Sequence, residues 1–335
     1  MTSVHKELTA RVGIPRPNAI LLDTPFGFQP NADDLVARIT DYFRQHVGLE
    51  ITLASLRHSG WATAPELEQF LARLTEANYV FAGPGSPTYA LRHWRDTGVR
   101  ERLVEKVALG GCVAFASAAA IGLGAYALPV YEIYKVGDDP SWMPGLDVLA
   151  QIGVRCAVIP HYNNQEGGTH DTRFCYMGEA RLRLLESMLP DDLLILGVDE
   201  YTACIIDVEA QSVTVRGRGG VTVRRRGSER VWKRTTFSLS ELQDGLRVDG
   251  LVATIVETEG VLRERFADIA SAGESEEVRV RGSIAPLVEL LLSLRDEARH
   301  QRRFNDADRI RAILAECGVT IRDTPSGTAW ALVHA

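Results

Sequence analysis

The first 210 residues alternate short apolar runs with longer amphipathic segments, and this alternation restricts the fold more than any other feature of the chain. In the longer segments, such as 32–46 and 65–77, apolar residues recur at helical spacing. Apolar runs separated by such segments are typical of parallel strands joined by helical crossovers. The predicted strands are 19–26, 50–56, 79–83, 112–116, 154–160, 193–198 and 203–208. We therefore expect an α/β domain with a mostly parallel sheet, helices on both of its faces, and a functional site at the carboxyl ends of the strands.

The pattern changes in the last third of the chain, which predicts several smaller parts. Residues 212–227 alternate with a period of two around a Gly-Gly pair, which predicts a β-hairpin, and a further strand is expected at 231–237. Charged helical pieces and a polar stretch in 238–283 indicate a linker. Residues 284–335 contain two helical segments, which predicts a small helical hairpin. The expected domains are therefore 1–237, 238–283 and 284–335.

Length, charge and cysteine content limit the class of protein. A chain of 335 residues can form one or two domains, and 45% hydrophobic with 24% charged residues is ordinary for a soluble globular protein. A net charge of −7 argues against a protein that coats nucleic acid everywhere, although a local basic face is compatible with it. The sequence predicts neither a signal peptide nor a membrane span. Five cysteines without a CxxC pair favour reduced thiols in a cytoplasmic protein with no structural zinc, and we expect no cofactor.

Ser117 ends an apolar run and precedes a segment of small residues. A serine between a strand and a helix can present its hydroxyl as a nucleophile, and it would need a histidine and backbone donors nearby. The glycine-containing turn 83–86 and His161 both follow predicted strands, so each is placed for such a role. The alternative is a structural serine where a strand ends. The G-x-S-x-G pattern is also imperfect, because Phe115 and Ala119 stand where it has glycines.

Four segments in this order resemble the cyanophycinase/peptidase E family of serine peptidases, whose α/β fold is related to class I glutamine amidotransferases. The segments are FAGPGSPTYAL, AFASAAA, IPHYNN and LGVDEYTACIID, and the resemblance covers roughly residues 19–225. It implies that Ser117 is the nucleophile and His161 the general base, with backbone N–H groups of Gly85 and Ala118 as oxyanion donors. The resemblance also places an acid after the serine, at a spacing that Glu132 meets.

The segment after His161 is richer in polar groups than a base alone requires. Glu166 and Asp171 are alternatives to Glu132 as the acid that orients the histidine. The expected substrate-binding residues are Asn163, Asn164, Glu166 and Arg173, the last as a partner for a substrate carboxylate or phosphate. The competing interpretation is a solvated loop before the next helix, with Glu132 a solvated strand residue.

The end of the chain resembles a second family, the C-terminal segment of cysteinyl-tRNA synthetases, over residues 286–330. The matching residues are Arg295, Ala298, Arg299, Phe304, Ala307, Asp308, Ile310, Arg311, Leu314, Gly318, Val319, Asp323, Thr324, Gly327 and Trp330. No segment resembles the catalytic domain of those enzymes, so we do not expect the chain to charge tRNA. The resemblance makes tRNA a candidate partner, contacted by Arg295, Arg299, Arg302 and Arg303. The alternative is that these arginines pair with neighbouring acids on a solvated face.

The sequence thus leads to one functional expectation and one alternative. We expect a cytoplasmic serine hydrolase, a peptidase or amidase that forms an acyl-enzyme on Ser117, with tRNA or a tRNA-linked substrate recruited by the C-terminal segment. The substrate would be a peptide or amide, no membrane would be involved, and a homodimer is a candidate assembly. The alternative is a catalytically inactive binding protein of the same fold, which the altered glycine positions around the serine favour.

Overall fold

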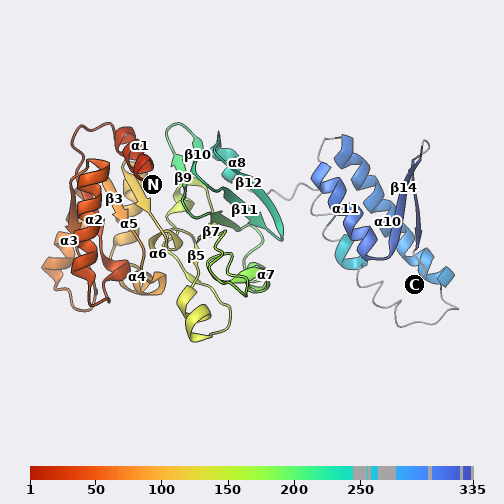
Figure 1. Ribbon diagram of the computed structural model, residues 1–335, viewed down its shortest axis with the longest axis horizontal. Coiled ribbons are helices and arrows are strands. Elements are labelled where there is room, and N and C mark those ends of the chain that lie inside the picture. Colours follow the sequence, from red (N-terminus) through yellow and green to blue (C-terminus); the bar gives the residue numbers. More distant parts are fainter. Residues whose placement is uncertain (244–254, 256–257, 263–276, 301–303, 325–326, 333–335) are drawn as a thin grey trace. The chain divides into compact units, whose positions relative to one another are not determined.

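The computed structural model describes residues 1–243, 255, 258–262, 277–300, 304–324 and 327–332 (Figure 1). The chain divides into two compact units, Met1–Leu246 and Arg247–Ala335, and each is described by itself. The first unit has the expected α/β character, with a parallel sheet and helices. In the described parts of both units, no helix combines the length and the apolarity that crossing a membrane requires.

A fully parallel four-stranded sheet forms the N-terminal half of the first unit. Its strands, in the order in which they pair, are β2 (Ile51–Ala54), β1 (Ala19–Leu22), β3 (Tyr79–Ala82) and β4 (Cys112–Phe115). The helices of this half are α1 (Thr2–Val12), α2 (Ala32–Tyr42), α3 (Ala64–Glu76), α4 (Pro87–Trp94) and α5 (Val99–Ala108), with a π-helical turn η2 (Phe43–Val47) after α2.

Both faces of this sheet are buried at its central strands β1 and β3, which explains why these two strands are continuous apolar runs. On one face, Ile20 and Leu22 of β1 belong to a core that includes Phe70 of α3 and Leu103 of α5. On the other face, Ala19 and Leu21 belong to a core with Phe43, against which side chains of α1 and α2 pack. The helices therefore cover both faces of the four-stranded sheet.

The second half of this unit contains two further sheets. A six-stranded sheet has the order β12 (Ser228–Trp232), β11 (Val221–Arg225), β8 (Leu194–Val198), β7 (Cys156–Pro160), β5 (Tyr126–Ala127), β6 (Met143–Pro144). Its central strands β5, β7 and β8 are parallel. A three-stranded antiparallel sheet has the order β13 (Thr236–Ser238), β10 (Ser212–Gly217), β9 (Thr202–Asp207). The helices here are α6 (Ala118–Ile121), α7 (Gly178–Ser187) and α8 (Leu239–Gln243).

The hairpin predicted for 212–227 is wrong, because its two strands lie in different sheets. β10 pairs with β9 and β13, whereas β11 pairs with β8 and β12. The connecting turn is held by the preceding loop: the N–H of Gly219 donates to Thr202 Oγ1 at 2.9 Å and that of Gly220 to Asp199 Oδ2 at 2.7 Å. The alternating pattern identified both strands, but strand pairing is a non-local property that the pattern does not contain.

The second unit contains a helical segment at 258–262, a pair of longer helices and a strand pair. Helix α10 (Glu277–His300) contacts α11 (Phe304–Glu316), and the antiparallel strands β14 (Val319–Thr324) and β15 (Gly327–Leu332) follow (Figure 1). Buried apolar side chains from these elements form one core: Leu291, Ile310, Leu314 and Val319 are among them. A helical hairpin alone therefore describes this unit incompletely. Much of the predicted linker 238–283 lies outside the described residues.

The stability of the first unit is expected to depend on the protonation of His5. This side chain of α1 lies against Phe43 and Phe81, its Nδ1 is 2.7 Å from the Tyr79 hydroxyl, and burial lowers its pKa to about 4. Since the unfolded chain binds the proton more tightly, this group's contribution is complete above about pH 6.5 and is lost as the pH falls toward 4.

We expect the free energy of unfolding to fall by about 3 kcal/mol over that range on account of His5. Urea unfolding at several pH values should show this decline in the wild type and a flatter profile in His5→Gln, which removes the titration. Equal slopes for the two proteins would contradict the assignment.

Candidate active site

Ser117 lies on a sharp turn between β4 and the short helix α6. Its backbone has φ 52° and ψ −120°. This conformation is unfavourable for any residue other than glycine. Strained strand-to-helix turns of this kind expose a nucleophilic hydroxyl in α/β hydrolases. The turn forms without the two glycines of the usual pattern: at those positions Ala119 is fully buried and Phe115 packs on Trp94 with ring centroids 5.8 Å apart.

The turn 83–86 lies beside the serine turn, as the adjacency of β3 and β4 requires. The N–H of Ala119 donates to the carbonyl of Gly83 at 3.3 Å. Gly85 has φ 150°, and a Cβ there would lie 1.9 Å from the carbonyl oxygen of Pro25. Gly85 is thus required for the close approach of this turn to residues 25–26. The oxyanion roles of the Gly85 and Ala118 N–H groups stay predictions.

His161 is the partner of Ser117. It follows the last residue of β7, and its Nε2 is 2.9 Å from Ser117 Oγ. Its Nδ1 is 3.3 Å from Oε1 of Glu200, which lies just beyond the end of the adjacent parallel strand β8. With Nδ1 protonated, the ring donates to Glu200, and Nε2 is left to accept the serine proton. Ser117, His161 and Glu200 therefore form a continuous hydrogen-bonded chain.

The carboxylate beside His161 is thus Glu200, and the expectation that Glu132 would hold this position is wrong. Glu132 begins the π-helical turn η3 (Glu132–Val136), and its Oε2 is buried without a hydrogen-bond partner among the described residues. The two alternatives are engaged elsewhere. Glu166 accepts the Tyr176 hydroxyl at 2.6 Å, which lowers the pKa of Glu166, and Asp171 forms a bidentate pair with Arg173.

Of the expected substrate-binding residues, the two asparagines hold Glu200 in place, and Arg173 pairs with an acidic neighbour. Asn164 is buried and donates to Oε1 of Glu200 at 3.1 Å, and Asn163 Oδ1 accepts the N–H of Glu200 at 2.8 Å. Both asparagines therefore hold the carboxylate that contacts His161. Arg173 donates hydrogen bonds to both carboxylate oxygens of Asp171, and these bonds hold the pKa of Asp171 well below its usual range. A substrate anion would have to compete with that pair for Arg173.

The loop that carries His161 is closed by its own backbone. His161 has φ 52°, and its carbonyl accepts the N–H groups of Asn164 at 3.1 Å and Cys175 at 3.2 Å. Phe174, Cys175 and Tyr176 are three consecutive residues with positive φ. Non-glycine residues persist in this conformation only where the surrounding structure enforces it. The position of the imidazole is therefore set by contacts across the loop and not by local preference.

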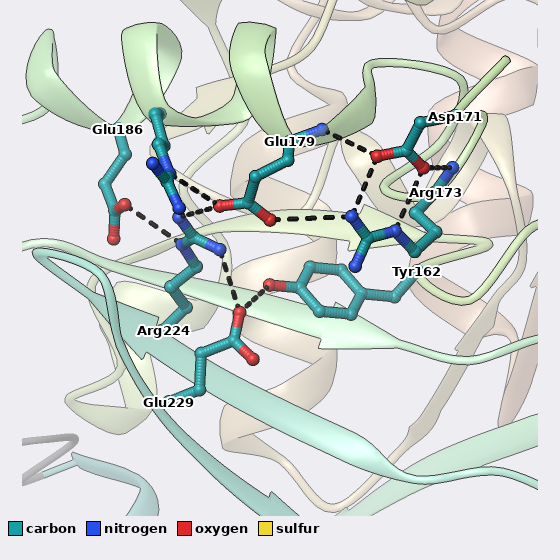
Figure 2. A network of polar contacts seen from close by, with 8 residues as sticks. Tyr162, Asp171, Arg173, Glu179, Glu186, Arg224 and Glu229 are labelled. Carbon is teal, nitrogen blue, oxygen red and sulfur yellow. Dashed lines mark hydrogen bonds and ion pairs between the residues drawn. The ribbon is translucent and has the colours of Figure 1, made fainter. Parts of the chain in front are cut away.

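A buried arginine of β11 joins helix α7 to the β11–β12 strand pair (Figure 2). The Arg224 side chain is 4% exposed and donates to Glu179 at 3.0 Å, Glu186 at 3.0 Å and Glu229 at 2.9 Å. Burial disfavours its charge, but the hydrogen bond to Glu179 and the charge of Glu186 outweigh burial and raise the pKa of Arg224. Glu229 also accepts the hydroxyl of Tyr162, the residue after His161, at 3.0 Å.

The basic residues expected to contact RNA have different environments in the second unit. Arg295 is buried and bonds both carboxylate oxygens of Asp323 at 2.9 Å, which assigns it a structural contact instead of a phosphate contact. Arg299 is half-exposed and lies 3.3 Å from the same carboxylate. Arg302 and Arg303 lie outside the described residues. In the described part of the second unit, Arg311 and Arg322 are exposed and have no described ionic partner.

Comparisons with known proteins separate the two units. Residues 281–330 match the family model of the cysteinyl-tRNA ligase anticodon binding domain. The chain is 40% identical over 85 residues to the cysteine–tRNA ligase of Nitratidesulfovibrio vulgaris, a match that covers 25% of this chain and 17% of the relative. It is 50% identical over 50 residues to the enzyme of Leifsonia xyli subsp. xyli, covering 15% and 10% respectively. The chain thus spans about a sixth or less of these relatives.

A solved structure resembles the larger part of the chain. It is a peptidase from an acI-B1 Actinobacterium, with a TM-score of 0.57 and 18% identity, and the match covers 71% of this chain and 90% of that one. Similarity at this identity shows a shared fold. The two matches correspond to the two resemblances drawn from the sequence. The peptidase match shows a shared fold, and the match of residues 281–330 is to a domain family.

Proposed function

We propose that the protein is a serine hydrolase that cleaves an amide or related acyl bond through an acyl-enzyme on Ser117. The observation that carries this proposal is the hydrogen-bonded chain from Ser117 through His161 to Glu200. His161 takes the serine proton as Ser117 Oγ attacks the substrate carbonyl, and it returns that proton to the leaving group. Glu200 holds the imidazole tautomer and stabilises the imidazolium. The strained serine turn supports the enzyme over the inactive binding protein, because backbone strain without a function would only lower the stability of the fold.

Covalent capture tests the proposal directly. A fluorophosphonate probe should add one adduct to the full-length protein, and mass spectrometry of its peptides should locate that adduct on Ser117. Prior unfolding of the protein should abolish labelling, since the reactivity of Ser117 depends on its hydrogen bond to His161 and on that of His161 to Glu200. An unlabelled folded protein would favour the inactive binding protein.

The assignment of Glu200 predicts the effects of two matched substitutions. Glu200→Gln removes the charge that stabilises the imidazolium and disturbs the tautomer, so we expect labelling of Ser117 to slow by about 10²- to 10⁴-fold. Glu132→Gln, the same chemical change at the position first expected from the sequence, should leave the rate within about threefold, since Glu132 makes no contact with His161. A larger effect at Glu132 than at Glu200 would reverse the assignment.

We also propose that the second unit binds tRNA, supported by the match of residues 281–330 to an anticodon binding domain. Arg311 on α11 and Arg322 on β14 are exposed, and no described carboxylate lies within ion-pair distance of either. Unpaired guanidinium groups are suited to phosphate contacts, which are weakened by salt.

The tRNA proposal predicts a specific salt dependence. Arg311→Ala and Arg322→Ala should each weaken the shift of total tRNA in gels and reduce the slope of log affinity against log salt by about one. Arg102→Ala is the matched control, since Arg102 is a half-exposed arginine of the first unit that pairs with Glu105. Equal losses in all three variants, or no salt-sensitive shift of the wild type, would remove the tRNA role.

A further inference from the structure

A cavity of about 320 Å³ opens beside Glu200, in the first unit. It is lined by Asn163, Gln165, Glu200, Tyr201, Arg218 and Gly219. Its volume lies within the range of small-molecule sites. Because Glu200 contacts His161, and His161 contacts Ser117, the cavity begins one side chain away from the proposed general base.

Two side chains of this cavity are exposed without an evident structural purpose. Tyr201 is 67% exposed and has φ 54°, a strained conformation for a non-glycine residue. The Arg218 guanidinium lies over its ring, 5.4 Å from the centroid, and no described carboxylate is within ion-pair distance of Arg218. The cavity therefore presents to solvent an aromatic ring with a cation over one of its faces.

Hydrogen bonds within the protein hold the walls of the cavity in place. The N–H of Arg218 donates to the Tyr201 carbonyl at 3.1 Å, and the N–H of Gly219 donates to Thr202 Oγ1 at 2.9 Å. Asn163 is oriented by the N–H of Glu200. Preorganisation of this kind reduces the free energy that a ligand must supply for ordering.

We propose that this cavity binds the 3′-terminal nucleotide of an acylated tRNA, so that the substrate is an ester carried by that nucleotide; the inference rests on the proposed hydrolase function. Tyr201 offers a ring on which a base stacks, Arg218 a guanidinium for the phosphate, and Asn163 and Gln165 amides for polar edges. A simple carboxylate ligand would account for Arg218 but not for the exposed ring. The match of residues 281–330 to a tRNA ligase domain favours RNA as the source of the nucleotide.

The reaction balances with the residues described. Ser117 Oγ forms a bond to the acyl carbon, and the ester bond from that carbon to the ribose oxygen breaks. His161 receives the serine proton and transfers it to the ribose oxygen, which leaves as a hydroxyl. Water then cleaves the acyl-enzyme, giving up one proton to His161, from which Ser117 recovers it. The products are the free acid and the deacylated nucleotide.

Binding of adenosine 5′-monophosphate to the full-length protein, measured by calorimetry, tests the cavity independently of catalysis. We expect binding by the wild type, and at least about tenfold weaker binding by Tyr201→Ala and by Arg218→Ala, since each loses one of the two recognition elements. Arg226→Ala is the matched control, an exposed arginine outside the cavity that pairs with Asp191. No binding up to about 10 mM, or equal binding by all variants, would overturn the proposal.

Kinetics distinguish failure of the cavity from failure of the hydrolase. The two cavity variants should raise KM for a 3′-acylated tRNA by about tenfold or more while leaving hydrolysis of the corresponding methyl ester and fluorophosphonate labelling within about twofold. Equal losses on both esters would mean that the residues are structural, which overturns the cavity proposal. If Ser117 is not labelled but the nucleotide still binds with the expected variant pattern, the hydrolase function fails and the binding site stands.

Discussion

Ser117→Ala is expected to lower kcat/KM for any acyl substrate of the protein by at least about 10⁴-fold, the scale on which loss of a serine nucleophile acts. The substitution removes the one oxygen that His161 Nε2 contacts at 2.9 Å, and with it the atom that would become acylated. The initial burst of product that an acyl-enzyme gives should disappear together with steady-state turnover. Stopped-flow measurement with a chromogenic ester would record both.

The fold should survive this substitution, which separates chemistry from stability. Alanine adopts the φ of 52° at about the same cost as serine, so the free energy of unfolding should stay within about 0.5 kcal/mol of the wild type. Ser187→Ala is the matched control, an exposed serine at the end of α7 whose hydroxyl bonds only the Leu184 carbonyl. Turnover by Ser117→Ala at the wild-type rate would contradict the proposed mechanism.

Arg224→Ala is expected to destabilise the first unit by about 3–5 kcal/mol, because it leaves the nearly buried carboxylate of Glu186 without its cation. Glu186 is only 10% exposed, so water replaces the lost partner poorly, whereas Glu179 and Glu229 are 30% and 35% exposed and Glu179 keeps its pair with Arg183 (Figure 2). A loss of this size should lower the unfolding temperature by roughly 6–20 °C in a unit of this length. Calorimetry of the full-length chain would measure it.

Arg183→Ala provides a control that shares one of the partners. Arg183 also bonds Glu179, at 2.9 Å, but its side chain is 74% exposed, so its removal should cost less than about 1 kcal/mol. If the two variants unfold at the same temperature, the buried cluster contributes no more than a surface pair. A further effect is expected only for Arg224→Ala: slower labelling of Ser117, since Glu229 links Arg224 to Tyr162, the neighbour of His161.

The fold class was predictable because its signals are local. Side chains alternate with a period of two in strands and recur at helical spacing in helices, so seven apolar runs identified β1, β2, β3, β4, β7, β8 and β9 to within a few residues. The same runs placed Ser117 and His161 at strand ends. The β14–β15 strand pair was missed because the segment that contains it was assigned to a helical hairpin.

The acid beside His161 was missed because its position depends on strand order. The spacing that the family resemblance implies points to Glu132, whereas Glu200 reaches Nδ1 of His161 because β7 and β8 are parallel neighbours whose carboxyl ends meet. A signal was available: Glu200 follows a predicted strand by two residues, in a segment that already resembled the peptidase family. Strand ends that lie at one sheet edge gather functional groups, and this would have favoured Glu200 over a spacing argument.

The sequence by itself therefore determined the α/β character of the first unit, the strand positions, and the serine and histidine that the structure brings together, because each follows from patterns a few residues long. Only the tertiary structure decided that Glu200 is the carboxylate hydrogen-bonded to His161, that β10 and β11 belong to different sheets, and that Arg295 is buried against Asp323. These are contacts between residues far apart in sequence. They depend on which surfaces pack together, and burial then fixes which charges must be paired.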